Sequence, residues 1–250
     1  MAKPAKTDRK AVIEEMRKKQ KSADRRRGTV IVAVCVLVGL GIIAAAVVPI
    51  LLNKHEDSKL DNVALDKLGS AASVCQKTTT QKADGNQNHV PVDTPVTYTT
   101  APPAFGAHWN QAGLAPASFS KKFYTADERP PLEALVHNLE HGYTILWYDQ
   151  TIAKDSSAVD NIKAIARKFG DENYRDKFIA APWLSSDEDG AKFPDGQHVA
   201  FTHWSAGGNG ETDTTKQVGA FQYCSDVSGA ALKTFMDTYP YTDSPEPDAM

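Results

Sequence analysis

An uncharged, apolar run of 24 residues, TVIVAVCVLVGLGIIAAAVVPILL, occupies residues 29–52. As a helix rising 1.5 Å per residue, it reaches about 36 Å, more than the roughly 30 Å of a bilayer's hydrocarbon core. A cleaved secretory signal is the alternative, but a signal core has only about 7–15 residues, and no A-x-A-like cleavage site follows this run. The sequence therefore predicts one transmembrane helix at residues 29–52.

The charges on the two sides of this run differ strongly. Residues 1–28 carry eleven Lys/Arg and four Asp/Glu, although the whole chain has a net charge of −3. By the positive-inside rule this basic tail stays cytoplasmic, which predicts a single-pass protein of the cell membrane with its C-terminal domain extracytoplasmic. The outer part is net acidic and offers no basic surface for nucleic acid, so we expect the lipid bilayer, and not nucleic acid, as a partner.

Beyond the apolar run, the sequence divides into three parts. Residues 53–72 form a polar connector, residues 73–245 a globular domain, and residues 246–250 a tail. The chain is 41% hydrophobic and 24% charged, an ordinary balance for a globular domain of moderate size.

Two cysteines, Cys75 and Cys224, lie outside the apolar run, and Cys35 lies within it. An extracytoplasmic compartment permits disulfides, so we expect Cys75 and Cys224 to pair. The chain has no C-x-x-C motif, and we interpret this bond as structural instead of redox-active.

Hydrophobic periodicity predicts the elements of the domain. Residues 76–120 are rich in turn-forming residues, with a short strand expected at PVTYTT (95–100). In PPLEALVHNLEHG (130–142), four apolar residues fall at i, i+3, i+4 and i+7, which predicts an amphipathic helix, and a strand through LEALVHN is the competing interpretation. Strands are then predicted at YTILWYD, KFIAAPW and HVAFTHW, and helices at AVDNIKAIARKF and GAALKTFMDTYP.

This order, β-α-β-β-α after an irregular N-terminal half, indicates an α+β fold or an α/β sandwich. A thioredoxin-like sheet is one member of this class. The predicted architecture is thus an extracytoplasmic α+β domain preceded by a single N-terminal transmembrane helix.

The VHNLEH stretch contains two histidines and a glutamate in the order H-x-x-E-H. On a helix, His137 and His141 project from the same face one turn apart, a workable pair of metal ligands. The order matches the inverzincin peptidases, in which the glutamate, here Glu140, activates water. Those enzymes also need a distant glutamate ligand in a much larger helical fold, so we do not favour a peptidase.

Two interpretations of the histidines stay open. The first is a transition-metal site, for zinc or copper, using His137, His141 and Glu140 together with His108 or His203. The second is structural: these side chains hydrogen-bond the backbone and hold the irregular chain on the core.

At PPAFGAHW, VHNLEHGYTILWY and YPYTDSPEP the chain resembles the domain-of-unknown-function 3105 family of actinobacterial membrane-anchored proteins. The resemblance covers roughly residues 75–247, and Phe105 stands where the family often has Ser. It implies an extracytoplasmic domain behind one helix and no particular reaction, because the family's function is uncharacterised. The family motifs contain His108, His137, Glu140 and His141.

No complete catalytic set is recognisable in the sequence, so we favour a non-enzymatic function. The leading hypothesis is an anchored accessory or binding subunit of a larger membrane protein assembly, with a respiratory-chain complex as one plausible host. The alternative is an extracytoplasmic metal-binding protein or metalloenzyme that uses the His137-Glu140-His141 motif. Convergence of His108 and His203 on that motif would favour the alternative.

Overall fold

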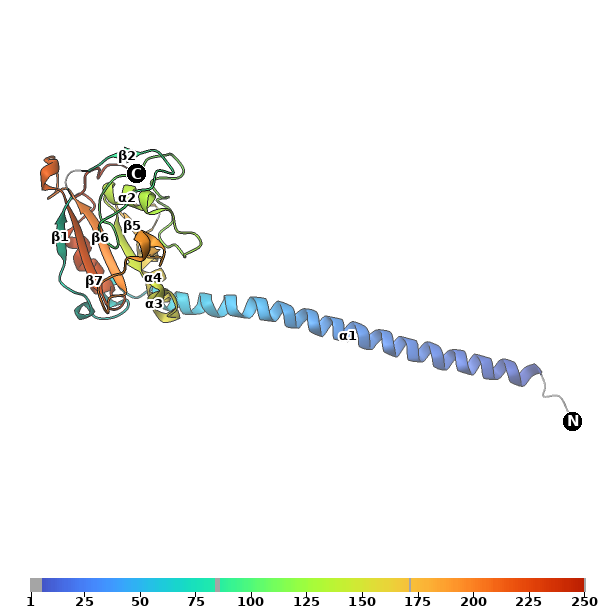
Figure 1. Cartoon of the computed structure of the whole chain (residues 1–250). Coiled ribbons are helices and arrows are strands. Elements are labelled where there is room, and N and C mark those ends of the chain that lie inside the picture. Colours follow the sequence, from blue (N-terminus) through green and yellow to red (C-terminus); the bar gives the residue numbers. More distant parts are fainter. Residues whose placement is uncertain (1–5, 84–85, 171, 250) are drawn as a thin grey trace. The chain divides into compact units, whose positions relative to one another are not determined.

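A long helix, α1 (Lys6–Asp61), begins the part of the chain that the structure describes (Figure 1). The computed structural model describes residues 6–83, 86–170 and 172–249, in two units, Met1–Glu56 and Asp57–Met250. Within α1, Val12–Val48 is long and apolar enough to cross a membrane, and its most hydropathic window is not buried inside the protein. The expected long apolar helix is therefore confirmed as a candidate membrane span. The helix α1 itself extends beyond the apolar run at both ends.

The second unit contains a five-stranded sheet with the order β1-β7-β6-β4-β5 (Figure 1). β4 and β5 are parallel and are connected through α3 (Gln150–Ala153) and α4 (Ser156–Lys168), whereas the other neighbouring strands are antiparallel. This mixed sheet with helices confirms the α+β class, and the thioredoxin-like form stays a prediction. The strands are β1 (Thr79–Lys82), β4 (Thr144–Tyr148), β5 (Phe178–Pro182), β6 (Val199–Ser205) and β7 (Val218–Cys224).

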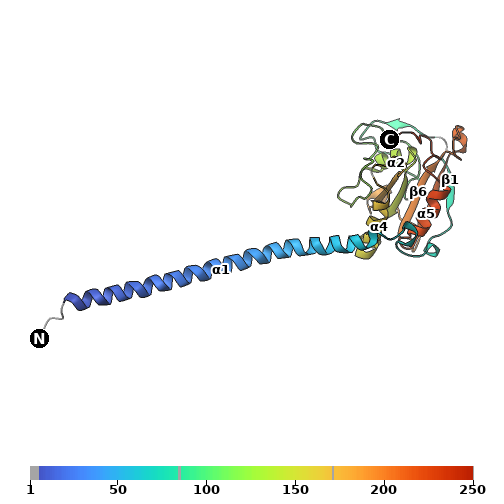
Figure 2. The same ribbon diagram turned by 180° about the vertical axis from the view of Figure 1, so that it is seen from behind.

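Helices cover both faces of the sheet, and β6 shows how its side chains alternate between them. Val199 and Phe201 join a core with α4 and α5 (Gly229–Thr238), while Ala200 and Trp204 join a core with α2 (Leu132–Glu140). Figure 2, the view from behind, shows α5 on the face of the sheet opposite α2. The α2 face is the one that positions the candidate site.

The helix α2 forms because its apolar stripe is buried against the sheet. Leu135, Val136 and Leu139 are fully buried, so the helical interpretation of this segment is confirmed and the competing strand is wrong. Gly142 ends the helical segment with a φ of 90°, and a Cβ there would lie 2.4 Å from the Tyr241 carbonyl oxygen. Only glycine fits this turn without displacing the C-terminal segment.

The remaining element predictions have mixed outcomes. β4, β5, β6, α4 and α5 match the patterns that predicted them. Residues 95–100, expected as a strand, form none. β7 was not anticipated because Gly219 and Gln222 interrupt its apolar alternation, but it pairs with β6 along its whole length. The pairing with β6 therefore forms this strand, although its local sequence pattern does not predict one.

The expected bond between Cys75 and Cys224 is present and joins the start of the domain to the end of β7. It closes a sequence separation of 149 residues. Leu68, from the segment expected to be a polar connector, is also buried in the core on the α4 and α5 side. The segment from Leu68 to Cys75, just before β1, is therefore held on the domain both by a buried side chain and by a covalent bond.

Candidate metal centre

Two very short strands bring two histidines together on the α2 face. β2 (His89–Val90) and β3 (His108–Trp109) pair in parallel with His89 opposite His108. Their imidazole centroids are 4.8 Å apart, and the His108 and His137 centroids are separated by the same 4.8 Å. The irregular half of the domain thus delivers two imidazoles to the last turn of α2.

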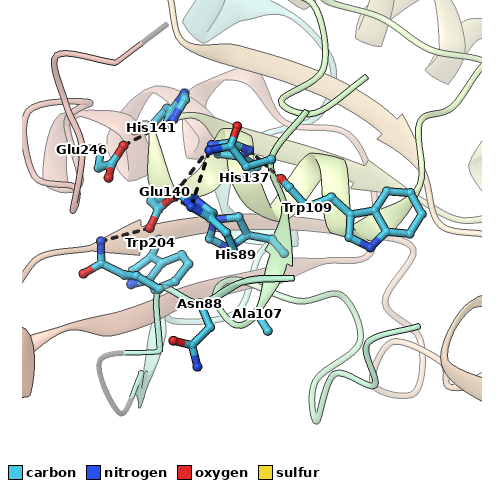
Figure 3. Close-up of polar contacts among 12 residues, drawn as sticks. Asn88, His89, Ala107, Trp109, His137, Glu140, His141, Trp204 and Glu246 are labelled. Atoms are coloured by element: carbon cyan, nitrogen blue, oxygen red, sulfur yellow. Dashed lines mark hydrogen bonds and ion pairs between the residues drawn. The ribbon is translucent and has the colours of Figure 1, made fainter. Parts of the chain in front are cut away.

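The three imidazoles converge on Glu140. Its Oε2 atom lies 2.8 Å from His108 Nε2, 3.4 Å from His89 Nε2 and 4.0 Å from His137 Nε2. The potential ligand atoms of these four residues all lie within 4.8 Å of one another. Figure 3 shows His89 and His137 directed toward the carboxylate. All three histidines present the same ring nitrogen to one oxygen.

Backbone carbonyls orient two of these rings. His108 Nδ1 lies 2.8 Å from the Gly106 carbonyl oxygen, and His137 Nδ1 lies 2.7 Å from the Trp109 carbonyl oxygen. A carbonyl only accepts, so each Nδ1 carries the proton and donates it. This arrangement fixes each ring and turns Nε2 toward Glu140, the usual environment of a metal-binding histidine. On His108, a metal ion would replace the proton that Nε2 donates to Glu140.

The other carboxylate oxygen of Glu140 is held by a chain of amides. Gln87 Nε2 donates to Glu140 Oε1 at 3.0 Å, and Gln217 Nε2 donates to Gln87 Oε1 at 2.8 Å. Trp204 Nε1 in turn donates to Gln217 Oε1 at 3.1 Å. The chain runs from the sheet to Glu140 and keeps its Oε2 directed at the histidines.

Burial and neighbouring charges set the protonation states in this region. Burial lowers the pKa of His137 to about 4, assisted by His141 and His108. Burial would raise the pKa of Glu140, but the hydrogen bonds from His108 and Gln87 and the charge of His108 hold it below its ordinary value. A neutral imidazole beside an ionised carboxylate is the protonation state that a metal ion requires.

A second group adjoins the first and shares Glu140. It consists of Glu140, His141 and Glu246, whose potential ligand atoms also lie within 4.8 Å of one another. His141 Nε2 is 3.6 Å from Glu246 Oε2 (Figure 3). Burial lowers the pKa of His141 to about 4, against the opposing charge of Glu140.

The structure brings most of the residues expected from sequence to this region. His108, His137 and Glu140 belong to the first group, and His141 belongs to the second, so the two histidines of the H-x-x-E-H motif fall in different groups. His141 follows the last residue of α2, and its ring centroid lies 4.4 Å from that of His137, as the i, i+4 spacing predicts.

His203, the alternative to His108, lies elsewhere. Its ring nitrogens are 3.2 Å from the Tyr143 carbonyl oxygen and 2.8 Å from the Asp243 carbonyl oxygen. His203 precedes Trp204 on β6, and successive strand residues point to opposite faces. Trp204 packs edge-on against His108, so His203 points away from the candidate site and has structural partners.

Sequence reasoning missed His89 and Glu246. His89 stands in a turn-rich segment, GNQNHV, and Glu246 in a polar tail, so neither lies in a periodic pattern. The available signal was chemical: Glu246 is a metal-compatible side chain within YPYTDSPEP, and His89 is one that follows three amide residues.

The first group suits a tetrahedral metal ion. Zinc binds imidazole nitrogen and carboxylate oxygen at about 2.0–2.2 Å, so its four ligand atoms stand about 3.4 Å from one another. The separations from Glu140 Oε2, 2.8 to 4.0 Å, bracket that value. Small side-chain movements would therefore complete a three-histidine, one-carboxylate site.

The chain belongs to the family described as "Protein of unknown function (DUF3105)", whose family profile matches residues 89–250. The resemblance inferred from the sequence motifs is thereby confirmed. The matched segment begins at His89 and includes Glu246, so it contains both groups of potential ligands. Comparison with curated proteins and with solved structures gave no match.

Proposed function

We propose that the C-terminal domain binds one transition-metal ion, zinc or copper, through His89, His108, His137 and Glu140. The observation that carries this proposal is the orientation of three Nε2 atoms toward one oxygen of Glu140, whose side chain is 1% exposed. Three basic nitrogens and one anionic oxygen around a common point are the donor set of a metal site.

Hydrogen bonding alone accounts for this arrangement less well. An N–H donor reaches a carboxylate at about 2.7–3.2 Å. His108 meets this criterion at 2.8 Å, but His89 at 3.4 Å and His137 at 4.0 Å do not. One cation placed between the four side chains would satisfy all of them, whereas one proton satisfies a single pair.

The donor atoms also favour particular metals. Imidazole and carboxylate suit zinc and divalent copper, whereas monovalent copper prefers sulfur. The two cysteines of the domain are joined in a disulfide, so neither supplies a thiolate. The His89 side chain is 40% exposed, which gives a metal ion a path to the buried ligands from solvent.

The test uses the full-length protein in detergent, stripped of metal and titrated with Zn²⁺ against a competing chelator. His89→Ala is the first variant, because His89 is exposed and its removal leaves the buried packing intact. Losing a residue that merely orients a ligand costs about 10- to 100-fold in metal affinity, so losing a ligand should cost at least that much.

The matched control is His198→Ala. His198 is also partly exposed and donates from Nδ1 to Asp149 at 2.8 Å, outside the proposed site. We expect unchanged zinc affinity in this variant. Equal affinities in the wild-type protein and both variants would refute the proposed ligand set, and a protein without measurable zinc affinity would refute the function.

For the cellular setting, we propose a basic tail in the cytoplasm and a metal-binding domain outside it. The charge asymmetry around residues 29–52 supports this orientation. The disulfide supports it as well, because such bonds persist in oxidising compartments. Alkylation of a cysteine introduced at residue 5 or at residue 120 by a membrane-impermeant reagent tests the orientation in intact cells. Labelling of the former and not the latter would contradict it.

A role as accessory subunit of a larger membrane assembly is the second candidate. The observation that favours it is the apolar surface of α1, whose side chains from Val30 to Val48 are largely exposed within the chain. That surface fits lipid or the helices of a partner, with a respiratory-chain complex as one such host. Purification in mild detergent that always yields the protein alone would contradict this role.

A further inference from the structure

Glu140 is the residue common to two groups of potential ligands. His89, His108 and His137 form the first group with it, and His141 and Glu246 form the second. Each carboxylate oxygen has two lone pairs. Glu140 can therefore keep the hydrogen bond from Gln87 and still contact two cations. A shared carboxylate of this kind is a common feature of centres with two metal ions about 3.5–4 Å apart.

The imidazole of His141 lacks the partners that orient the other rings. His141 is 5% exposed, and its buried Nδ1 has no hydrogen-bond partner among the described residues. Its Nε2 is 3.6 Å from Glu246, beyond hydrogen-bond distance. By contrast, His108 and His137 each donate from Nδ1 to a carbonyl. A buried imidazole without a hydrogen-bond partner at Nδ1, next to two carboxylates, is typical of a site that binds a ligand.

The position of Glu246 is fixed although its side chain is 44% exposed. Its backbone N–H donates to the Glu140 carbonyl oxygen at 3.0 Å. The buried Lys177 ammonium fastens the same segment by donating to the carbonyl oxygens of His141, Pro247 and Ala249 at 2.6–2.7 Å. The C-terminal segment is thus docked on the end of α2, where it presents Glu246 to His141.

We propose that Glu140, His141 and Glu246 hold a second divalent transition-metal ion, with Glu140 bridging the two ions. This inference rests on the proposed function, because the bridge requires the first ion. The second position has one imidazole and two carboxylates, one of them exposed, so solvent completes its coordination. It binds Zn²⁺ more weakly than the three-histidine position and fills after it.

The test is the number of zinc ions bound per chain by the full-length protein in detergent. Metal-free protein is titrated with Zn²⁺ alone, and bound zinc is measured after equilibrium dialysis. The wild-type protein should bind two ions in two resolved steps. Glu246→Gln should abolish the weaker step and keep the tighter one. Its exposed side chain makes this substitution compatible with folding.

Asp248→Asn is the matched control, because it removes the same charge from the same segment at a residue outside both groups. It should still bind two ions. A wild-type protein that binds one ion, or a Glu246→Gln variant that still binds two, overturns the second position and leaves the first intact. A wild-type protein that binds none overturns both. The three outcomes therefore distinguish the two proposals.

Discussion

His108 and Glu140 are 32 residues apart in sequence, yet His108 Nε2 lies 2.8 Å from Glu140 Oε2, and both side chains are almost completely buried. The pair connects the irregular half of the domain to the last turn of α2. In the metal-free protein it is a charge-assisted hydrogen bond, and with a metal ion both atoms become ligands. The same two residues thus serve the fold in one state and the metal centre in the other.

Glu140→Gln should separate these two roles. The amide keeps the shape of the side chain and can still accept a hydrogen bond, but it removes the negative charge that a cation needs. We expect the domain to remain folded and its zinc affinity to fall by at least about 100-fold, more than the loss of an orienting residue costs. Chelator competition measures the affinity, and circular dichroism monitors the fold. Unchanged affinity would remove Glu140 from the ligand set.

Gln87→Ala should weaken the site without removing a ligand. Gln87 holds Glu140 Oε1 and is itself held by Gln217. Losing this support should lower zinc affinity by about 10- to 100-fold, as outer partners of metal ligands commonly do. Gln222→Ala is the control, since Gln222 is a β7 glutamine that donates to the Gln76 carbonyl oxygen away from the site. A larger effect in the control variant would contradict the amide chain.

The metal-free protein should lose stability in mild acid. The pKa values of His137 and His141 fall from 6.5 to about 4 on folding, mainly through burial. Between these values the unfolded chain binds more protons than the folded one, so the free energy of unfolding decreases as the pH falls from 6.5 to 4. Above pH 6.5 this contribution is fully present. Urea midpoints across the window measure it.

The control for this pH dependence is the double variant His137→Gln, His141→Gln. Glutamine does not titrate in this range, so the variant should show a shallower loss of stability between pH 6.5 and 4 than the wild-type protein. Equal slopes for the two proteins would show that other groups cause the acid sensitivity.

Removing the disulfide should lower the stability of the domain strongly, and its effect on metal binding should be far smaller. In the chain-entropy account, a bond that closes about 150 residues contributes about 5 kcal/mol to the free energy of unfolding. Cys224 packs in the core on the α4 and α5 side, on the face opposite α2. The double variant Cys75→Ala, Cys224→Ala should therefore unfold at much lower urea and, where folded, retain wild-type zinc affinity. A parallel loss of affinity would show that the bond also shapes the site.

Local sequence patterns predicted the elements that carry the site, and long-range pairing decided the rest. The apolar stripe of α2 correctly predicted a helix that carries His137 and Glu140, because helical periodicity is a local property. His89 could not be found this way. It reaches the site through the two-residue pairing of β2 with β3, which no pattern in a turn-rich segment indicates.

His141 lies beside His137, as the i, i+4 spacing predicts, with ring centroids 4.4 Å apart. It belongs to the second group because Glu246 lies next to it. Glu246 depends on the docking of the C-terminal segment by Lys177, whose three carbonyl partners are distant in sequence. The second group of ligands is therefore a product of tertiary structure.

X-ray absorption at the zinc edge, on full-length protein loaded with one equivalent of Zn²⁺, identifies the ligands of the proposed metal centre. We expect three imidazole nitrogens and one carboxylate oxygen at about 2.0–2.2 Å in tetrahedral geometry. The His89→Ala protein should show one imidazole fewer. A spectrum dominated by water oxygens, or one that His89→Ala leaves unchanged, would contradict the proposed centre and return these histidines to a purely structural role.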